Sequence, residues 1–410
     1  MSVARPRMVF VSPLFLFPTD SGGKIRTTNI LRGLKGGAFE VTLMSPARGE
    51  QVERWRAEID TLCDRYVPWP AGRSKARWQR ALDLLGDTPV NVAVDRTPQG
   101  LAAVRAMADS GEVDVMVFDF VHASVLRPIR MAFPAICFTH NVEAEIFARH
   151  AQESRHRLWR RVWSSQHAKM VRFESAALRG YEKVIAVSER DASQFHRSYG
   201  VASAEAIPTG VDLDHFSWQL PPDPGPERPP TVVFTGAMDS PANIDGVRFF
   251  LDEIWPRVAT ELPQARFVVV GKHPPAALVS QARRWPTVEF TGLVDDVRPH
   301  IRVAQVSVIP LRVGGGTRIK AFEAMAIGSP VVSTAVGIEG LDVQVGTHFL
   351  ASDDPTGFAG AVLHLLRDSA ARRRLSRAAR ALVEARFGHR VASQAFEDIC
   401  LRTLKQAPSA

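Results

Sequence analysis

Residues 313–325, with the sequence VGGGTRIKAFEAM, gather side chains that could bind a phosphorylated ligand. Consecutive glycines let the backbone approach an anion closely, and the helix that follows offers its free N–H groups. Arg318 and Lys320 add positive charge, and Glu323 shares a helix face with Lys320. A phosphate at the glycines and a ribose diol on the Glu323 carboxylate would be two ends of one nucleotide. The residues that we assign to this site are Gly314, Gly315, Gly316, Thr317, Arg318, Lys320 and Glu323.

The same segment also fits an ordinary glycine-rich loop before a core helix with solvated basic residues. It is not a P-loop, because Ala321 follows Lys320 where Ser or Thr is required, and it has no G-x-G-x-x-G pattern. The rest of the chain has to decide between the two interpretations.

A second glycine loop, PTDSGGKIR at 18–26, follows the first predicted strand and leads into a helix. Gly22, Gly23 and Arg26 could form a second anion site there. The alternative is a tight turn from strand to helix with a solvated Arg26.

His140 follows another predicted strand, in the sequence THNVE, where Asn141 could cap the next helix. His140 thus stands at a strand end, where it would face a ligand cleft, and the alternative is a structural histidine. A metal site of His140, Glu143 and His150 lacks a supporting second cluster of ligands, so we expect no metal there.

Short runs of Val, Ile and Phe alternate with helical patterns along the chain, which is typical of parallel strands buried on both faces and joined by right-handed crossovers. Ligands of such sheets bind at the carboxyl ends of the strands, so we also assign Gly236, Gly271 and Gly292 to nucleotide binding. The predicted strands are 8–12, 41–44, 113–118, 135–139, 183–187, 204–207, 231–235, 266–270, 288–291, 306–310 and 330–333.

Six prolines fall within the thirteen residues 218–230, a composition that neither a helix nor a central strand accommodates. We therefore predict a linker there, between an N-terminal domain 1–217 and a C-terminal domain 231–387. Residues 388–410 read as a C-terminal helix and tail, and a return of that helix to the N-terminal domain is an open alternative.

The 410 residues carry a formal net charge of +8, which favours anionic partners such as nucleotides or acidic lipids. Three widely spaced cysteines fit a reducing compartment, and the apolar run 8–18 is broken by Pro13 and lacks a cleavage site. We expect a cytoplasmic protein, with attachment to the cytoplasmic face of a membrane as an open alternative.

The stretch 153–183 alternates basic and aromatic residues in a helical pattern. It reads either as a solvated basic face above an aromatic core stripe or as a patch for an anionic membrane surface. No nucleic-acid-binding module accompanies the charge, so we expect no nucleic-acid partner. The residues concerned are Arg155, Arg157, Arg160, Arg161, Lys169, Arg172, Arg179, Trp159, Trp163 and Phe173.

Several motifs in order resemble those of family-4 glycosyltransferases of the GT-B fold: SGGKIR, VIAVSERD, IPTGVDLDHF, FTGLVDDVRPHIRVAQVSVIPL, GGGTRIKAFEAMAIGSPVVST and GIEGL. They cover most of the chain, and the GGGTRIK loop is similar to that of bacterial exopolysaccharide sugar transferases. The resemblance implies an α/β protein with two Rossmann-like domains that face each other across a cleft.

The resemblance further implies transfer of a hexosyl group with retention, from a nucleotide sugar, preferably a UDP-sugar, to a glycan or lipid-linked acceptor. The resemblance implies no catalytic metal and no other cofactor, because the nucleotide sugar is a substrate. Glu323 matches the family's ribose-binding glutamate, Gly314 to Thr317 match the donor loop, and Gly22 and Gly23 match the phosphate-side loop. His140 would lie near the transferred sugar.

The chain departs from the family pattern at three places. Gly315 stands where the first motif glutamate is expected, Thr209 replaces an Asn, and the segment 235–243 lacks the usual Arg and Lys. We infer that Arg318 and Lys320 neutralise the diphosphate instead. These departures keep two alternatives open, a GT-B nucleotide-sugar epimerase and a non-catalytic nucleotide-binding protein.

Overall fold

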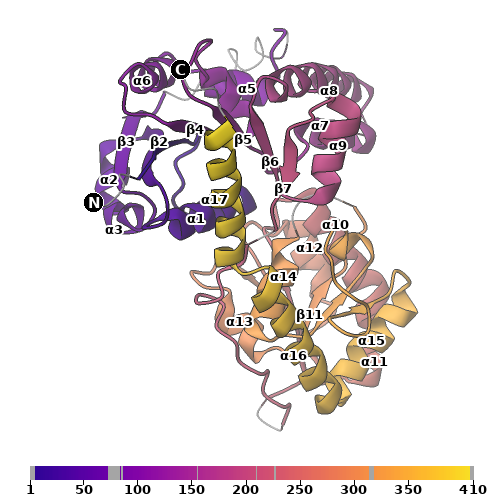
Figure 1. Cartoon of the computed structure of the whole chain (residues 1–410). Helices are drawn as coiled ribbons and strands as arrows, with labels where there is room; N and C mark the ends of the chain where they lie inside the picture. The colour runs from indigo at the N-terminus through magenta and orange to yellow at the C-terminus, as the bar shows by residue number, and fades with distance from the viewer. Residues whose placement is uncertain are drawn as a thin grey trace. The chain divides into compact units, whose positions relative to one another are not determined.

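The computed structural model describes residues 5–72, 84, 86–154, 156–208, 210–225, 228–313 and 318–406 (Figure 1). The chain forms two compact units. Unit 1 comprises residues 1–210 and 389–410, and unit 2 comprises residues 211–388. Each unit has its own parallel sheet with helices on both faces.

The described part of unit 1 contains a seven-stranded sheet in the order β3-β2-β1-β4-β5-β6-β7, in which all neighbours pair in parallel. The strands are β1 (Arg7–Val11), β2 (Glu40–Ala47), β3 (Arg65–Pro70), β4 (Val115–Asp119), β5 (Ala135–Phe138), β6 (Lys183–Ala186) and β7 (Ala204–Ala206). The helices are α1 (Gly22–Leu34), α2 (Gly49–Arg54), α3 (Arg56–Asp60), α5 (Val90–Asp95), α6 (Pro98–Ala108), a 3-10 helix (Val121–Leu126), α7 (Glu143–Glu153), α8 (Arg157–Leu178), α9 (Glu189–Tyr199) and α17 (His389–Gln406).

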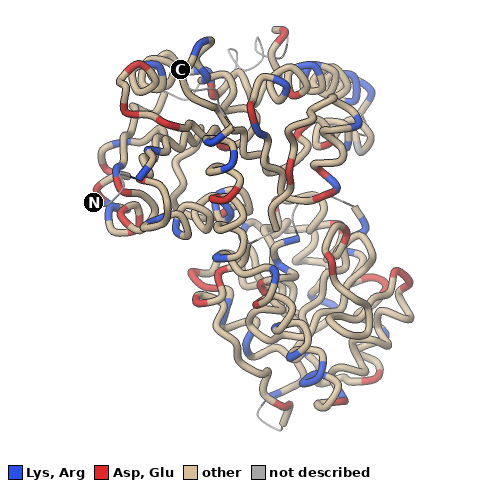
Figure 2. Tube along the Cα trace, viewed as in Figure 1, with Lys and Arg blue, Asp and Glu red and all other residues tan. Residues whose placement is uncertain are grey.

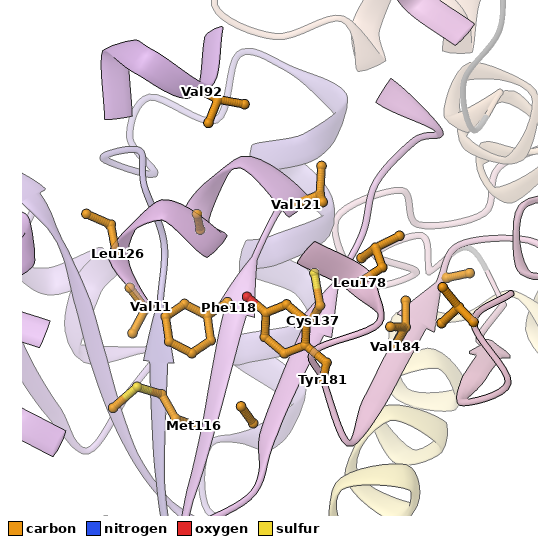
Figure 3. Close-up of a cluster of buried hydrophobic side chains, with 14 of the residues drawn as sticks. Val11, Val92, Met116, Phe118, Val121, Leu126, Cys137, Leu178, Tyr181 and Val184 are labelled. Carbon is orange, nitrogen blue, oxygen red and sulfur yellow. The ribbon is translucent and has the colours of Figure 1, made fainter. Parts of the chain in front are cut away.

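Alternate residues of these strands enter two separate cores, as the twofold side-chain period of a strand requires. Met8 and Phe10 of β1 pack towards α1 and α17, whereas Val9 and Val11 pack on the opposite face. Figure 3 shows this second core, in which Val11, Phe118 and Cys137 of three strands meet Val121, Leu126 and Leu178 of the covering helices. Burial on both faces explains why the strands read as continuous apolar runs.

Unit 2 has a six-stranded parallel sheet among its described residues, in the order β10-β9-β8-β11-β12-β13. The strands are β8 (Thr231–Thr235), β9 (Arg266–Val270), β10 (Val288–Gly292), β11 (Val306–Ile309), β12 (Val331–Ser333) and β13 (Leu350–Ala351). The helices are α10 (Pro241–Phe249), a π-helical turn (Phe250–Ile254), α11 (Trp255–Glu261), α12 (Ala276–Ala282), α13 (Arg298–Val303), α14 (Ile319–Ile327), a 3-10 helix (Val336–Ile338), α15 (Pro355–Arg367) and α16 (Ser369–Arg386).

The sequence missed two edge strands. β3 contains Pro68 and Pro70, which cannot donate to a ladder and are tolerated because β3 pairs on one side only, with β2. β13 is two residues long and carries no hydrophobic run that would reveal it.

The Pro-rich segment is anchored on unit 2. The Gln219 N–H donates to the Ile327 carbonyl at 2.9 Å, and the Gln305 amide donates to the Pro222 carbonyl at 2.8 Å. The Arg372 guanidinium, itself buried, pairs with the Asp223 carboxylate. The two units divide between residues 210 and 211, before the Pro-rich segment and a few residues from the boundary expected at 217.

The last helix, α17, belongs to unit 1 although 178 residues of unit 2 separate it from the rest of that unit. Ala392, Phe396 and Ile399 enter the same core as Ile30 and Leu31 of α1. Gly33 marks the close approach of the two helices, because a Cβ there would lie 2.4 Å from the Ser393 Cβ.

We predict that Gly33→Ala destabilises unit 1 by about 1–3 kcal/mol, because the added methyl group overlaps Ser393. Urea denaturation followed by circular dichroism would measure the loss. The matched control is Gly360→Ala in α15, where a Cβ meets nothing within 4 Å and the same change should stabilise the protein by about 0.5–1 kcal/mol. Equal effects of the two changes would contradict this packing.

Candidate functional site

The first cluster of polar groups lies in unit 2, where β8 and β9 end and α14 begins. Gly236 and Gly271, which follow these two strands, are in contact, because a Cβ on Gly271 would lie 1.9 Å from the Gly236 carbonyl oxygen. A Cβ on Gly236 would lie 2.8 Å from the Lys320 ammonium. The structure therefore brings together three residues that the sequence analysis assigned to ligand binding.

Lys320 lies in the first turn of α14, and its position is fixed by neutral groups. Its ammonium donates to the Asn243 side-chain oxygen at 2.8 Å and lies 4.5 Å from the centre of the Phe234 ring. Asn243 in turn donates to the Ala237 carbonyl at 2.8 Å. Loss of hydration lowers the pKa of Lys320 to about 7, with a further contribution from Arg318, and the Glu323 carboxylate opposes the shift. An anionic ligand would restore the charged form.

Arg318 is the N-cap residue of α14 and has a left-handed backbone, with φ of 49°. Such a conformation is uncommon for a residue with a side chain and costs about 1–3 kcal/mol, a strain typical of functional sites. The residue is 7% exposed, and its guanidinium lies 3.7 Å from the Glu339 carboxylate. Its cation is thus held beside Lys320 at the N-terminal end of a helix, where the helix dipole also favours an anion.

Glu323 lies one turn further along α14 and is half-buried. Burial raises the pKa of its carboxyl group to about 7, and Lys320 opposes this effect. Within the described residues its carboxylate makes no hydrogen bond or ion pair, so both oxygens are available to accept hydrogen bonds from a ligand.

The other residues predicted for this site are the four residues of the donor loop and Gly292. Gly314, Gly315, Gly316 and Thr317 lie outside the described residues. Gly292 ends β10 with φ of 71°, a backbone conformation that favours glycine, and a Cβ there would meet nothing within 4 Å.

The second cluster lies in unit 1, where β1, β4 and β5 end. His140, just after β5, is 3% exposed, and its Nε2 lies 2.7 Å from an oxygen of Asp119, the last residue of β4. The Asp119 carboxylate also accepts hydrogen bonds from the Thr27 hydroxyl at 2.9 Å and from the Ser12 hydroxyl at 3.1 Å. Burial lowers the pKa of His140 in spite of the nearby Asp119.

The glycine loop of unit 1 lies against this histidine. Phe120, with φ of 65°, stacks on the His140 ring at 4.0 Å between centroids, and a Cβ on Gly23 would lie 2.6 Å from the Phe120 ring. Arg26 is 3% exposed, and burial lowers its pKa to about 9 against the charges of Asp191 and Asp119. The structure thus brings Gly23, Arg26 and His140 together, and Gly22 is the first residue of the same helix.

The predicted cap of the helix after His140 is wrong. α7 begins at Glu143 without a capping side chain from Asn141, and the buried Glu174 of α8 accepts the N–H groups of Glu143 and Ala144 at 2.9 and 3.2 Å. Burial raises the pKa of Glu174 to about 8. A partner thirty residues away on another helix leaves no local sequence pattern, which is why Asn141 looked like the better candidate.

The basic stretch 153–183 divides into a structural part and an exposed part. The Lys169 ammonium donates to the Leu84 carbonyl at 2.8 Å, and Arg179 donates to the Tyr199 carbonyl at 2.5 Å, so both serve the fold. Arg157, Arg160 and Arg161 are exposed in the first turns of α8, beside Leu158 and Trp159, and Figure 2 shows the blue segments along this helix. Arg155 lies outside the described residues.

The sequence analysis missed two residues that position others. Asp119 looked like the polar end of an apolar strand, and its partner His140 is 21 positions away. Asn243 lies in the segment 235–243, which the sequence analysis noted only because it lacks the usual Arg and Lys. The position of each residue at a strand end or in a first helical turn was the only available signal.

Comparison with protein families assigns both halves of the chain. Residues 21–215 match the model described as Glycosyltransferase Family 4, and residues 229–368 match the model described as Glycosyl transferases group 1. A search of curated proteins returned no match.

Solved structures with the same fold cover nearly the whole chain. Sucrose-phosphate synthase from Thermosynechococcus elongatus is 18% identical with a TM-score of 0.70, and the match covers 98% of this chain and 100% of that one. Anabaena HepE, in complex with UDP and glucose, is 15% identical with a TM-score of 0.68, over 98% and 100% of the two chains. WaaG, a glycosyltransferase involved in lipopolysaccharide biosynthesis, is 17% identical with a TM-score of 0.66, over 96% and 99%.

At these identities the likeness establishes the fold, and it confirms the predicted GT-B class. The two family models establish that the chain is a glycosyltransferase, because together they span most of both units. The chain is therefore a GT-B glycosyltransferase built from a family 4 domain followed by a group 1 domain.

Proposed function

We propose that the protein is a retaining hexosyltransferase that moves a sugar from a UDP-sugar to a glycan or lipid-linked acceptor in bacterial polysaccharide biosynthesis, without a metal or other cofactor. The observation that carries this proposal is the start of α14, where two desolvated cations precede a half-buried carboxylate. This order of charges suits a diphosphate followed by a ribose. The UDP bound to HepE and the pathway named for WaaG support the choice of donor and pathway.

The chemical demand on such a site is to stabilise a departing nucleoside diphosphate. Arg318 and Lys320 would neutralise the charge that develops on the phosphate oxygens, without a metal ion. Retention without a protein nucleophile suits attack of the acceptor hydroxyl on the face from which the diphosphate leaves, with a phosphate oxygen taking the hydroxyl proton. The bond to the diphosphate breaks as the new glycosidic bond forms. His140 would bind a hydroxyl of the sugar and transfer no proton.

The exposed start of α8 favours a membrane surface as a further partner. Leu158 and Trp159 are 61% and 51% exposed, and three arginines flank them, a combination that suits the boundary of an anionic bilayer. None of the described helices is both long and apolar enough to cross a membrane. We propose a cytoplasmic location with peripheral attachment through this turn.

Arg318→Ala and Lys320→Ala should each lower turnover by about 10²–10³-fold, because each removes a preorganised positive charge aimed at the leaving group. Release of UDP from UDP-glucose, with and without acceptor, would measure the effect. The matched control is Arg284→Ala, which removes an exposed cation of the same unit that pairs with Asp252 at 2.7 Å. Wild-type turnover in both variants would contradict the assignment, and conversion of the donor without an acceptor product would favour an epimerase.

Glu323→Ala should raise the Kd of UDP by about 10–100-fold, because it removes a charged acceptor of two ribose hydrogen bonds. Turnover at saturating donor should change little, since the ribose is bound alike in the ground and transition states. Calorimetric titration at pH 8, above the Glu323 pKa of about 7, would measure the affinity. Wild-type protein should bind 2′,3′-dideoxy-UDP as weakly as the variant binds UDP, and unchanged UDP affinity in the variant would rule out the ribose role.

Charge reversal at the start of α8, Arg160→Glu with Arg161→Glu, should lower binding to phosphatidylglycerol vesicles by at least about 25-fold, from about 1 kcal/mol for each lost cation. Wild-type binding should weaken as salt is raised and should be absent on phosphatidylcholine. Trp159→Ala tests the apolar contribution. Its control is Ile129→Ala, which removes a fully exposed apolar side chain of unit 1 outside α8. Equal binding of all variants in vesicle co-sedimentation would exclude this surface.

A further inference from the structure

The His140 ring offers a ligand one buried hydrogen-bonding atom. Its Nδ1 is buried and has no hydrogen-bond partner among the described residues. Its Nε2 is hydrogen-bonded to a carboxylate oxygen of Asp119 at 2.7 Å. The ring is held between Phe120 and Phe138, with centroids 4.0 and 4.6 Å away. The position where a Gly23 Cβ would stand lies 3.9 Å from Nδ1, so this atom is on the side of the glycine loop.

Asp119 determines which nitrogen of the ring carries the proton. It is fully buried, and its carboxylate accepts hydrogen bonds from the Ser12 and Thr27 hydroxyl groups, so it can offer the ring only acceptor oxygens. The ring nitrogen that faces it must therefore be the N–H donor. A neutral imidazole with its proton on Nε2 has a lone pair on Nδ1, and burial lowers the pKa of His140, which keeps the ring neutral.

We propose that Asp119 is a positioning residue that fixes His140 as the Nε2–H tautomer, so that Nδ1 selects a sugar hydroxyl that donates a hydrogen bond. The identity of the ligand, a sugar hydroxyl, rests on the proposed function. The tautomer of His140 does not depend on that function. A buried acceptor that loses its donor is left unsatisfied, which weakens binding by about 10–100-fold. The site should therefore reject a sugar whose hydroxyl at this position is replaced by fluorine, which has no proton to donate.

The tautomer is measured directly, in the protein without ligand. Long-range proton–nitrogen spectra of 15N-histidine-labelled protein at pH 7.5, assigned with a His140→Gln variant, should show a protonated Nε2 and an unprotonated Nδ1. Asp119→Asn places an amide that can donate to Nε2, and it should shift the proton to Nδ1. A wild-type His140 protonated on Nδ1, or on both nitrogens, would overturn the proposal whether or not the variant folds.

The matched control is Asp95→Asn. Asp95 makes a second aspartate–histidine pair in unit 1, with its carboxylate 2.5 Å from the His122 Nδ1. The same substitution there should alter the His122 resonances and leave the His140 tautomer unchanged. A change of the His140 tautomer in this control would mean that any loss of a buried aspartate in the unit acts on His140, and would overturn the specific role of Asp119.

Substrate selection is tested with UDP-glucose and its 3-, 4- and 6-deoxyfluoro analogues. In the wild type, one analogue should lose about 10–100-fold in kcat/KM, and in Asp119→Asn that discrimination should fall to within about threefold, because an Nδ1–H can face fluorine. Equal discrimination in both proteins would overturn the proposal. Absence of any reaction with UDP-glucose would count against the proposed donor, and the spectra alone would then decide the role of Asp119.

Discussion

Burial of both faces of each sheet is the constraint on which the rest of the structure depends. Side chains along β1, β4 and β5 enter apolar cores on either side, so a polar group can reach a ligand only where a strand ends. Ser12, Asp119 and His140 lie at the ends of these three strands, and Gly236 and Gly271 directly follow β8 and β9. In parallel sheets these ends share an edge, so each unit gathers its chemistry on one side.

The two clusters solve the problem of buried charge in different ways. In unit 1 the Asp119 carboxylate is surrounded by hydrogen-bond donors within the fold, so its interactions are complete before a ligand arrives. In unit 2 the Lys320 ammonium has an amide and an aromatic ring as its neighbours, and its charge is left for an anion to compensate. A preformed network gives direction, whereas an incompletely compensated cation gives affinity for phosphate.

Local patterns in the sequence predicted most of the strands, because continuous apolar runs are typical of parallel strands buried on both faces. The same reasoning failed wherever a partner is remote in sequence. Glu174 caps α7 from another helix, Asp119 meets His140 across two strands, and Asn243 holds Lys320 from 77 positions away. The sequence analysis also missed two edge strands, because β3 contains prolines and β13 is too short to show a pattern. The domain limits remain predictions that differ slightly from the compact units.

The return of α17 to unit 1 has a consequence for how the protein is made. Residues 1–210 are synthesised well before the ribosome reaches His389. At about 5–20 residues per second, the intervening chain takes roughly 10–35 s to synthesise. During that time Phe10, Phe138 and Ile30 lack the apolar cover that Phe396 and Ile399 later supply. Unit 2 can complete its fold first, although it is encoded second, because the core of unit 1 is complete only after α17 has been synthesised.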